Sequence, residues 1–293
     1  MEQTVDFYAE EIRCSYLVSA DMKKLWATEI EVLEVFKEIC RKHNITYFAA
    51  GGTLLGAARH NGYIPWDDDI DIQLKGDDFD KFCEVVADEL PENYFFESYK
   101  TENHFRPYHC KIRKTDTNAH TVGEKESNPD AAEGVWIDLF RMDYVPENAI
   151  VRRFRFCHLK CIRHLLSGES NSRKMKRYTG KQKAKQMCDP RIWAWTVYKL
   201  FTTDAKLSEK YCRLAKYTKP TQKLAATCFR PGNKTLTWDA DDFTETVELP
   251  FEYTTISAPK NYDKVLTQQY GDWHQFKHGT QYHSEVVMAD DKK

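Results

Sequence analysis

One segment of this chain, residues 51–74, restricts its fold more than any other. A glycine pair, Gly51 and Gly52, follows a short apolar run over residues 45–50 that has the length of a buried strand. Glycine lets the backbone turn sharply and approach a ligand, and the first amides of a helix attract anions. We therefore expect the start of the following helix, including Thr53, to hold a phosphate group.

The same segment crowds four carboxylates into five positions, and they are Asp67, Asp68, Asp69 and Asp71. Their mutual repulsion is costly unless cations or hydrogen bonds neutralise it. Apolar residues alternate with the acids up to residue 74, which is the period of a half-buried strand. Asp69 and Asp71 then share one face of that strand, about 7 Å apart. Such an oxygen-rich arrangement suits Mg²⁺ or Mn²⁺.

Two other interpretations apply to an acidic segment of this kind. A solvated acidic turn is the simpler one, but the glycine pair and the alternating apolar residues argue against it. A calcium-binding loop is the other, and it lacks the glycine and the distal glutamate of the helix-loop-helix type.

A later apolar run supplies a candidate third carboxylate, Asp138. Apolar residues alternate through residues 135–140, as in a central strand with one polar exception. A lone buried Asp is expensive without a cation, although an Asp that ends a strand and caps a turn is the alternative. If Asp69, Asp71 and Asp138 meet, they can hold one or two divalent cations for phosphoryl transfer. Asp138 can also accept the proton of an attacking hydroxyl.

Four basic residues are candidates for contacts with the remaining phosphate oxygens, and they are Arg59, His60, Lys111 and Arg113. For Arg59 and His60 the alternative is charge complementarity with a helix C-terminus. Lys111 and Arg113 alternate on an expected strand, so their alternative is a solvated edge of the sheet.

The segment Gly51–Leu74, with Trp66-Asp67-Asp68-Asp69-Ile70-Asp71 inside it, resembles the signature of the LicD family, which includes bacterial phosphocholine transferases and is related to the fukutin-related proteins. Shorter matches follow at Lys111-Ile112-Arg113, Gly134-Val135-Trp136-Ile137-Asp138, Pro259-Lys260-Asn261-Tyr262 and Tyr270-Gly271-Asp272. The resemblance covers about residues 25–145 and 255–275 and leaves the middle third of the chain uncovered. It implies a nucleotidyltransferase-like fold, in which a glycine pair precedes Asp-x-Asp and the third carboxylate comes from a later strand.

The resemblance also implies an activity: transfer of phosphocholine from CDP-choline, or a similar CDP-linked donor, to a hydroxyl of a cell-surface glycan, with release of CMP. A quaternary ammonium group favours an aromatic cage. Candidate cage residues near the motifs are Tyr63, Trp66, Trp136, Tyr270 and Trp273, with core packing as their alternative. Two further functions stay open, a nucleotidyltransferase that attacks the nucleotide α-phosphate and a non-catalytic protein that binds anionic glycans.

Charge is strongly segregated along the chain. Residues 151–220 contain 19 Lys or Arg against 4 Asp or Glu, a surplus of +15. Because the net charge of the whole chain is −2, the other residues together carry −17. Apolar residues recur there at helical spacing, and four would share one helix face, namely Trp193, Val197, Leu200 and Phe201. Such a segment suits a membrane surface or an anionic, lipid-linked glycan acceptor, and packing of the aromatics on the core is the alternative. Nucleic acid is not an expected partner, because no base-reading module accompanies the charge.

These observations predict an α/β fold, a nucleotidyltransferase-like mixed sheet flanked by helices with an inserted helical basic subdomain. We expect a catalytic core over residues 1–150, a mainly helical basic subdomain for acceptor or membrane-surface binding over residues 151–250, and a C-terminal helix returning to the core over residues 251–293. Residues 114–133 are polar and predict a loop.

Cysteine usage bears on the compartment. Nine cysteines, an odd number, occur without a recognisable signal peptide or transmembrane span, so we expect reduced thiols in a cytoplasmic protein. Peripheral contact with the inner face of the membrane is compatible with this expectation.

Overall fold

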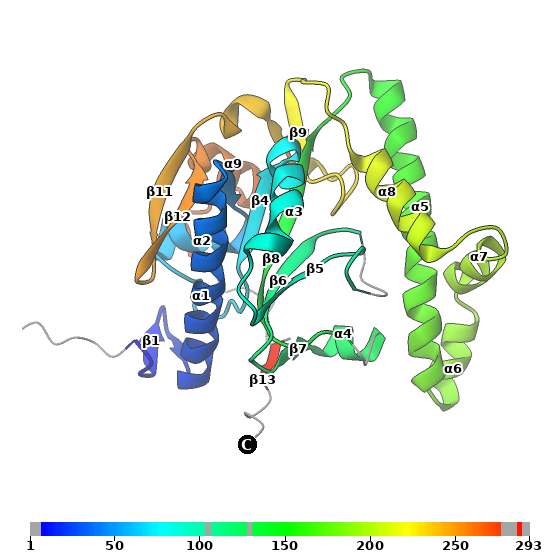
Figure 1. Ribbon diagram of the computed structural model, residues 1–293, viewed down its shortest axis with the longest axis horizontal. Helices are drawn as coiled ribbons and strands as arrows, with labels where there is room; N and C mark the ends of the chain where they lie inside the picture. The colour runs from blue at the N-terminus through cyan, green and yellow to red at the C-terminus, as the bar shows by residue number, and fades with distance from the viewer. Residues whose placement is uncertain (1–6, 103–106, 128–130, 277–285, 289–293) are drawn as a thin grey trace, which may run out of the picture.

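The computed structural model describes residues 7–102, 107–127, 131–276 and 286–288. Their centre is a seven-stranded mixed sheet flanked by helices, which confirms the expected fold class (Figure 1). The strands of this sheet are β3 (Tyr47–Ala49), β4 (Asp71–Lys75), β5 (Tyr94–Glu97), β6 (Cys110–Lys114), β8 (Val135–Tyr144), β9 (Lys223–Ala225) and β10 (Thr237–Asp239).

The described helices are α1 (Ala20–Lys42), α2 (Gly51–His60), α3 (Gly76–Glu89), α4 (Val122–Ser127), α5 (Ala149–Arg177), α6 (Gly180–Met187), α7 (Pro190–Tyr198), α8 (Asp204–Ala215) and α9 (Tyr262–Tyr270), with 3₁₀ turns η1 (Lys234–Leu236) and η2 (Ala240–Phe243). Three two-stranded sheets complete the described part: β1 (Glu11–Arg13) with β2 (Tyr16–Val18), β7 (Ala119–Thr121) with β13 (Val286–Met288), and β11 (Thr246–Phe251) with β12 (Thr254–Pro259).

The long strand β8 organises the sheet. It pairs in parallel with β4 on one side and antiparallel with β6 and β9 on the other. The order runs β10-β9-β8-β4-β3, with β5 attached through β6. As a result β6 lies between two strands and is not an edge of the sheet.

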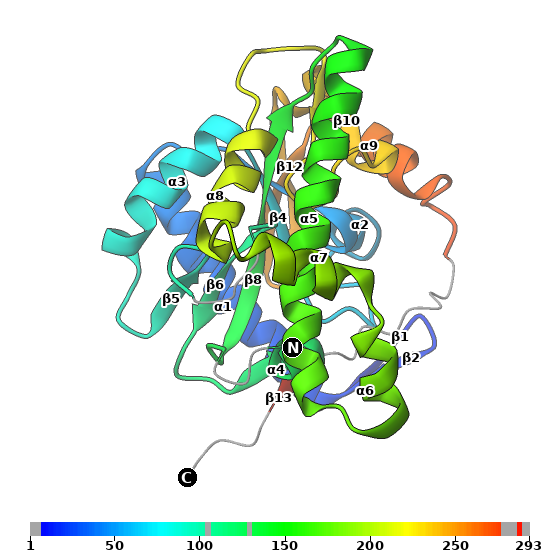
Figure 2. The same ribbon diagram turned by 90° about the vertical axis from the view of Figure 1, so that its right-hand side faces the viewer.

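The two faces of the sheet have different chemistry. Helices α1 and α3 cover one face, and α2 and α9 lie on the other (Figure 2). Ile72 and Leu139 are fully buried and belong to the same core as Phe36 and Phe82 of α1 and α3. Each such side chain contributes about 1.5–3 kcal/mol by leaving water. Because side chains alternate along a strand, this burial leaves Asp71 of β4 and Asp138 of β8 on the opposite face.

Helix α1 also fixes the acidic segment. Ser19 caps its N-terminus by accepting a hydrogen bond from the Met22 amide at 3.2 Å. One turn further on, the indole of Trp26 is fully buried and donates to the carbonyl oxygen of Asp67 at 2.9 Å. The loop before β4 is therefore held by a side chain far away in the sequence.

One local expectation differs from the structure. The expected loop over residues 114–133 contains β7 and α4 in its described part. Strand β7 pairs with β13 near the C-terminus, a partner that local sequence does not reveal. Residues 128–130 of this range lie outside the described part.

The basic segment forms helices α5 to α8 at one side of the sheet (Figures 1 and 2). The chain rejoins the central sheet at β9 and β10, inside the range 151–250 assigned to the helical subdomain. The β11–β12 hairpin then lies against β3. Among the described residues, no helix combines the length and apolar character needed to cross a bilayer.

Candidate active site

The glycine turn at the start of α2 lies directly beside the acidic segment. Gly51 has φ +51°, a left-handed conformation that favours glycine. A Cβ at Gly51 would lie 3.1 Å from Asp71 Oδ2, and one at Gly52 would lie 2.4 Å from Asp67 Oδ2. Thr53 Oγ1 accepts a hydrogen bond from the Asp71 amide at 2.8 Å. The hydroxyl of Thr53 therefore ties α2 to β4, and the missing side chains at the glycines leave room for the carboxylates.

The structure brings Asp69, Asp71 and Asp138 to one cavity of about 620 Å³. Asp71 and Asp138 are direct partners in the parallel β4–β8 pair, so their side chains lie on the same face of the sheet about 4.8 Å apart in strand spacing. Asp138 occupies the fourth position of the ten-residue strand β8, so the alternative that it ends a strand and caps a turn is wrong. The Trp136 indole donates to Asp138 Oδ2 at 3.0 Å and orients it.

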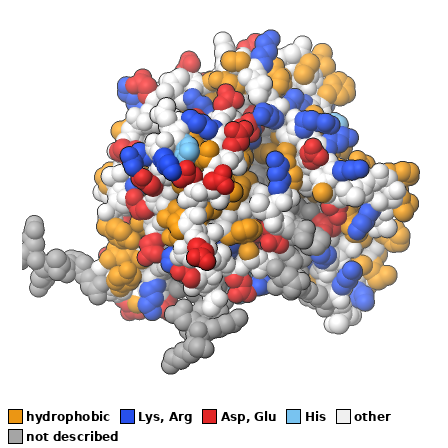
Figure 3. All heavy atoms as spheres, viewed as in Figure 1, with side chains coloured by type: hydrophobic (Ala, Val, Ile, Leu, Met, Phe, Trp, Pro, Cys, Tyr) orange, Lys and Arg blue, Asp and Glu red, His pale blue; other side chains and the backbone are white. Residues whose placement is uncertain are grey.

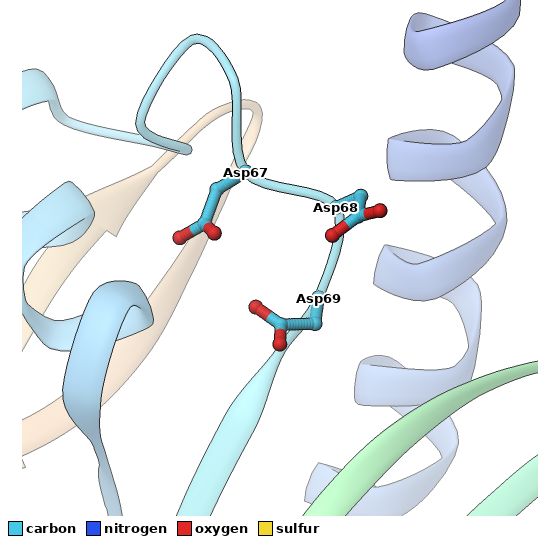
Figure 4. Close-up of side chains that lie close together, drawn as sticks. All are labelled: Asp67, Asp68 and Asp69. Atoms are coloured by element: carbon cyan, nitrogen blue, oxygen red, sulfur yellow. The ribbon is translucent and has the colours of Figure 1, made fainter. Parts of the chain in front are cut away.

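Asp67 is a cavity residue that the sequence did not single out from its neighbours. Figure 4 shows Asp67 and Asp69 turned to the same side of the loop, while Asp68 lies on the side of α1. Asp67 and Asp69 line the cavity together. Carboxylate oxygens of Asp67, Asp68 and Asp69, one from each residue, lie within 4.8 Å of one another. The Trp-Asp-Asp-Asp run at residues 66–69 was the sequence feature that indicated an acidic site, but it does not show which of its aspartates face the cavity.

Crowding of the carboxylates shows in their proton affinities. Burial raises the pKa of Asp71 well above its ordinary value, and the charges of Asp69, Asp138 and Asp67 raise it further, opposed only partly by Lys111. Burial, followed by Asp69 and Asp68, likewise raises the pKa of Asp67. Negative charge is therefore held here at a free-energy cost that a bound cation would remove.

The oxygens of this cluster are also incompletely satisfied. Asp138 Oδ1 is buried and accepts no hydrogen bond from the described residues. His109 Nε2 lies 3.2 Å from it, close enough for an ion pair, but burial lowers the pKa of His109 and disfavours its charged form. Clustered carboxylates with an unsatisfied buried oxygen have the chemistry to bind a hard divalent cation.

Arg59 and His60 occupy different places at the end of α2. Arg59 lines the cavity, and its Nη1 donates to the Trp273 carbonyl oxygen at 3.1 Å. His60 is not among the lining residues, and its Nε2 accepts from Arg59 Nε at 3.0 Å. Burial, with the charges of Arg59 and Arg13, lowers the pKa of His60 to about 4. A neutral His60 therefore positions Arg59.

Lys111 and Arg113, predicted as phosphate contacts, are not among the residues that line the cavity. Lys111 pairs with Glu124, while the fully buried Arg113 pairs with Glu97 at 2.5 Å and with Glu124 at 2.9 Å. Although burial opposes it, these two cations lower the pKa of Glu124 to about 2. The alternative of a solvated edge is wrong, because β6 is an interior strand. Their charges therefore connect β6 to β5 and to α4.

Aromatic side chains form much of the cavity wall. Phe140 and Phe229 are 4.7 Å apart between ring centroids, and the His109 ring lies 5.5 Å from Phe140. The aromatic residues that line the cavity are Trp66, Phe140, Phe229, Tyr270 and Trp273. Two other cage candidates lie elsewhere, since Tyr63 stacks on Trp26 in the core and Trp136 lies beneath Lys111 and Arg113.

Two cavity residues come from a part of the chain with no recognisable motif. Phe229 and Arg230 follow β9 and reach the cavity because β9 pairs with the far end of β8. No sequence pattern distinguished Arg230 from the other basic residues of the chain. Arg59 and Arg230 are the arginines among the lining residues.

Comparisons with known proteins agree with this geometry. Residues 44–151 match the family described as LicD/FKTN/FKRP, nucleotidyltransferase domain, a range that contains β3, α2, β4 and β8 with four of the five aspartates that line the cavity. A lipopolysaccharide cholinephosphotransferase LicD of Haemophilus influenzae is 29% identical over 170 residues, which is 52% of this chain and 60% of that protein.

Two uncharacterized rickettsial proteins are similar over shorter stretches. The protein of Rickettsia typhi is 37% identical over 90 residues, or 27% of this chain and 29% of its own length, and that of Rickettsia prowazekii is 54% identical over 41 residues, or 14% and 15%. The chain thus spans at most 60% of these relatives. Residues 44–151 therefore match the nucleotidyltransferase domain of the LicD family.

Proposed function

We propose that this chain is a divalent-metal-dependent phosphotransferase that moves phosphocholine, or a related phospho-substituent, from a CDP-linked donor to a hydroxyl of a cell-surface glycan and releases CMP. The meeting of Asp69, Asp71 and Asp138 in one cavity beside the glycine turn carries the proposal. The name of the Haemophilus influenzae relative, a lipopolysaccharide cholinephosphotransferase, supports the nature of the transferred group and of the acceptor.

In this proposal Asp69, Asp71 and Asp138 would hold Mg²⁺ or Mn²⁺, with Asp67 beside them. When bound, the cation supplies polarisation of the phosphoryl oxygens and charge stabilisation of the leaving phosphate. Asp138 accepts the proton of the acceptor hydroxyl. Arg59 and Arg230, the lining arginines, contact the remaining phosphate oxygens.

The cavity wall favours choline among the CDP-linked donors. A quaternary ammonium group cannot donate a hydrogen bond, and it is stabilised by the faces of aromatic rings. The rings of Phe140 and Phe229, together with Trp66, Tyr270 and Trp273, offer such faces next to the carboxylates. A ribitol or glycerol donor would instead require hydrogen-bonding groups for its hydroxyls.

Calorimetry with CDP-choline, CDP-ribitol and CDP-glycerol, each with and without Mg²⁺, tests the proposal. We expect CDP-choline to bind at least about tenfold more tightly than the other two, since one aromatic contact to a desolvated cation is worth about 1–2 kcal/mol. Asp138→Asn should remove the Mg²⁺ dependence, and Asp88→Asn, an exposed Asp in α3, should not. Equal affinity for all three donors would refute the choline assignment.

A nucleotidyltransferase that attacks the α-phosphate is a second candidate, because the matched domain is described by that activity. It would use the same carboxylates, so substitution of an aspartate cannot separate the two. Incubation of the chain with an acceptor glycan and CDP-choline labelled in the choline or in the cytidine does separate them. Label on the glycan from choline supports the phosphotransferase, and label from cytidine supports the nucleotidyltransferase. A protein that binds glycans without turnover would give neither product.

A further inference from the structure

Five large apolar side chains lie exposed on one part of the basic helical segment, which we call the α7 patch. They are Met187 (52% exposed), Trp193 (63%), Val197 (57%), Leu200 (79%) and Phe201 (82%). The alternative that the aromatic residues of this helix face pack on the core is therefore wrong for Trp193 and Phe201. Exposed apolar side chains at such density indicate a contact surface.

The patch is presented by a firmly packed helix. Ile192, on the opposite face of α7, is buried at 7% exposure, and the Trp195 indole donates to Asp204 at 2.8 Å. Gly168 of α5 allows close approach, because a Cβ there would lie 2.1 Å from the Arg191 carbonyl oxygen. Packing on one face of α7 thus leaves the other face outward.

The outward face continues beyond the helix end. The Leu200 amide donates to the Val197 carbonyl at 3.2 Å, and the Phe201 amide to the Tyr198 carbonyl at 3.0 Å. These turns keep Leu200 and Phe201 in line with Val197, at roughly helical spacing. Met187 joins the patch through its carbonyl, which accepts from the Trp193 indole at 2.8 Å.

Charge around the patch identifies the kind of partner. Residues 151–220 carry a surplus of +15, and Lys199, Lys181 and Lys183 are exposed on α7's end and on α6. Figure 3 shows hydrophobic and basic side chains mixed along the edge of the molecule where α5 and α7 lie. A second copy of the chain would bring two such surpluses together, so like-charge repulsion opposes self-association through this patch.

We propose that the α7 patch docks this chain on an anionic lipid bilayer. Trp, Phe and Leu side chains enter the boundary between headgroups and acyl chains, and the surrounding lysines are attracted to anionic headgroups. Docking of this kind requires no membrane-spanning helix. It goes beyond the proposed transfer reaction and does not depend on it.

Co-sedimentation with vesicles of phosphatidylcholine alone, or mixed with phosphatidylglycerol, tests the docking. We expect binding to the mixed vesicles that weakens as salt rises, and at least about a tenfold loss of the partition coefficient in the variant Leu200→Ser/Phe201→Ser. The matched control is Ile12→Ser/Leu17→Ser. These two residues are exposed by 75% and 58%, and they are cross-strand partners in the β1–β2 hairpin on the far side of the molecule (Figure 1).

Several outcomes would overturn the docking proposal. They are no binding to the mixed vesicles, equal binding to neutral vesicles, equal loss in both double variants, or a concentration-dependent dimer that Leu200→Ser/Phe201→Ser abolishes. Circular dichroism and CDP-choline calorimetry on both variants verify the fold and the cavity. Because donor binding is measured without vesicles, failure of the proposed function and failure of the docking are distinguishable.

Discussion

Substitution of Asp71 by Asn should stabilise the metal-free protein and abolish its response to Mg²⁺. The folded protein holds the pKa of Asp71 above its ordinary value of about 3.9 through burial and then through Asp69, Asp138 and Asp67. A carboxyl whose pKa is raised on folding binds its proton more tightly in the folded state. The stabilisation that protonated Asp71 contributes is therefore fully present below about pH 4, and it is lost as the pH rises through the pKa of Asp71 in the folded protein.

The size of the effect follows from the strand spacing. Two unit charges about 4.8 Å apart repel by about 3.5 kcal/mol at an effective dielectric constant of about 20. Asp71 and Asp138 face each other at this spacing. Because protonation of Asp71 relieves part of this repulsion, we expect a smaller net gain of about 1–3 kcal/mol. At about 2 °C per kcal/mol for a chain of this length, the melting temperature should rise by about 2–6 °C.

Thermal unfolding in chelator between pH 5 and pH 8, repeated with Mg²⁺, measures this prediction. Wild type should lose stability toward pH 8 and regain it with Mg²⁺, whereas Asp71→Asn should show a shallower slope and a much smaller Mg²⁺ response. Asp88→Asn is the matched control, because Asp88 is exposed in α3 and its substitution should stay within about 0.5 kcal/mol of wild type. A lower melting temperature for Asp71→Asn, or an undiminished Mg²⁺ response, would refute the electrostatic reasoning.

Three further predictions concern neighbouring positions. Gly52→Ala should lower turnover at least about tenfold in a folded protein, because its Cβ would lie 2.4 Å from Asp67 Oδ2 and displace that carboxylate. Arg113→Gln should destabilise the chain by about 3–5 kcal/mol in urea unfolding, since it leaves the buried Glu97 unpaired. His60, with its pKa lowered to about 4, should show no titration by NMR between pH 6 and pH 8 in the folded protein. In the unfolded chain His60 takes up its proton below about pH 6.5, so acidification below that pH should favour unfolding.

Each of these predictions has a result that contradicts it. Gly123→Ala is the control for the glycine substitution, because a Cβ there meets nothing within 4 Å, and equal turnover of both variants would exclude a steric role for Gly52. Loss of CDP-choline affinity in Arg113→Gln at unchanged stability would restore that arginine as a donor contact. A midpoint for His60 near pH 6.5, assigned by comparison with His60→Gln, would mean that the ring is not buried beside Arg59.

The local pattern of the sequence was sufficient for the part of the site that lies along one strand and one turn. Glycine at Gly51 requires no tertiary contact to predict a sharp turn, and period-two alternation by itself orients Asp71 and Asp138 away from the apolar face. The mixed sheet followed from the same alternation together with the family resemblance. These features depend on backbone geometry over a few residues, which sequence states directly.

Tertiary structure decided everything that depends on which neighbour covers a surface. Lys111 and Arg113 alternate as a solvated edge would, yet β5 pairs with the outer side of β6, so their charges are buried against acids from distant segments. Arg230 reaches the cavity only because β9 returns to β8, and Trp193 is exposed only because α5 covers the other face of α7. The hydrophobicity and charge of a side chain determine which environment is favourable for it. The environment that it has in the protein depends on segments distant in the sequence, and only the tertiary structure determines which of these segments contact it.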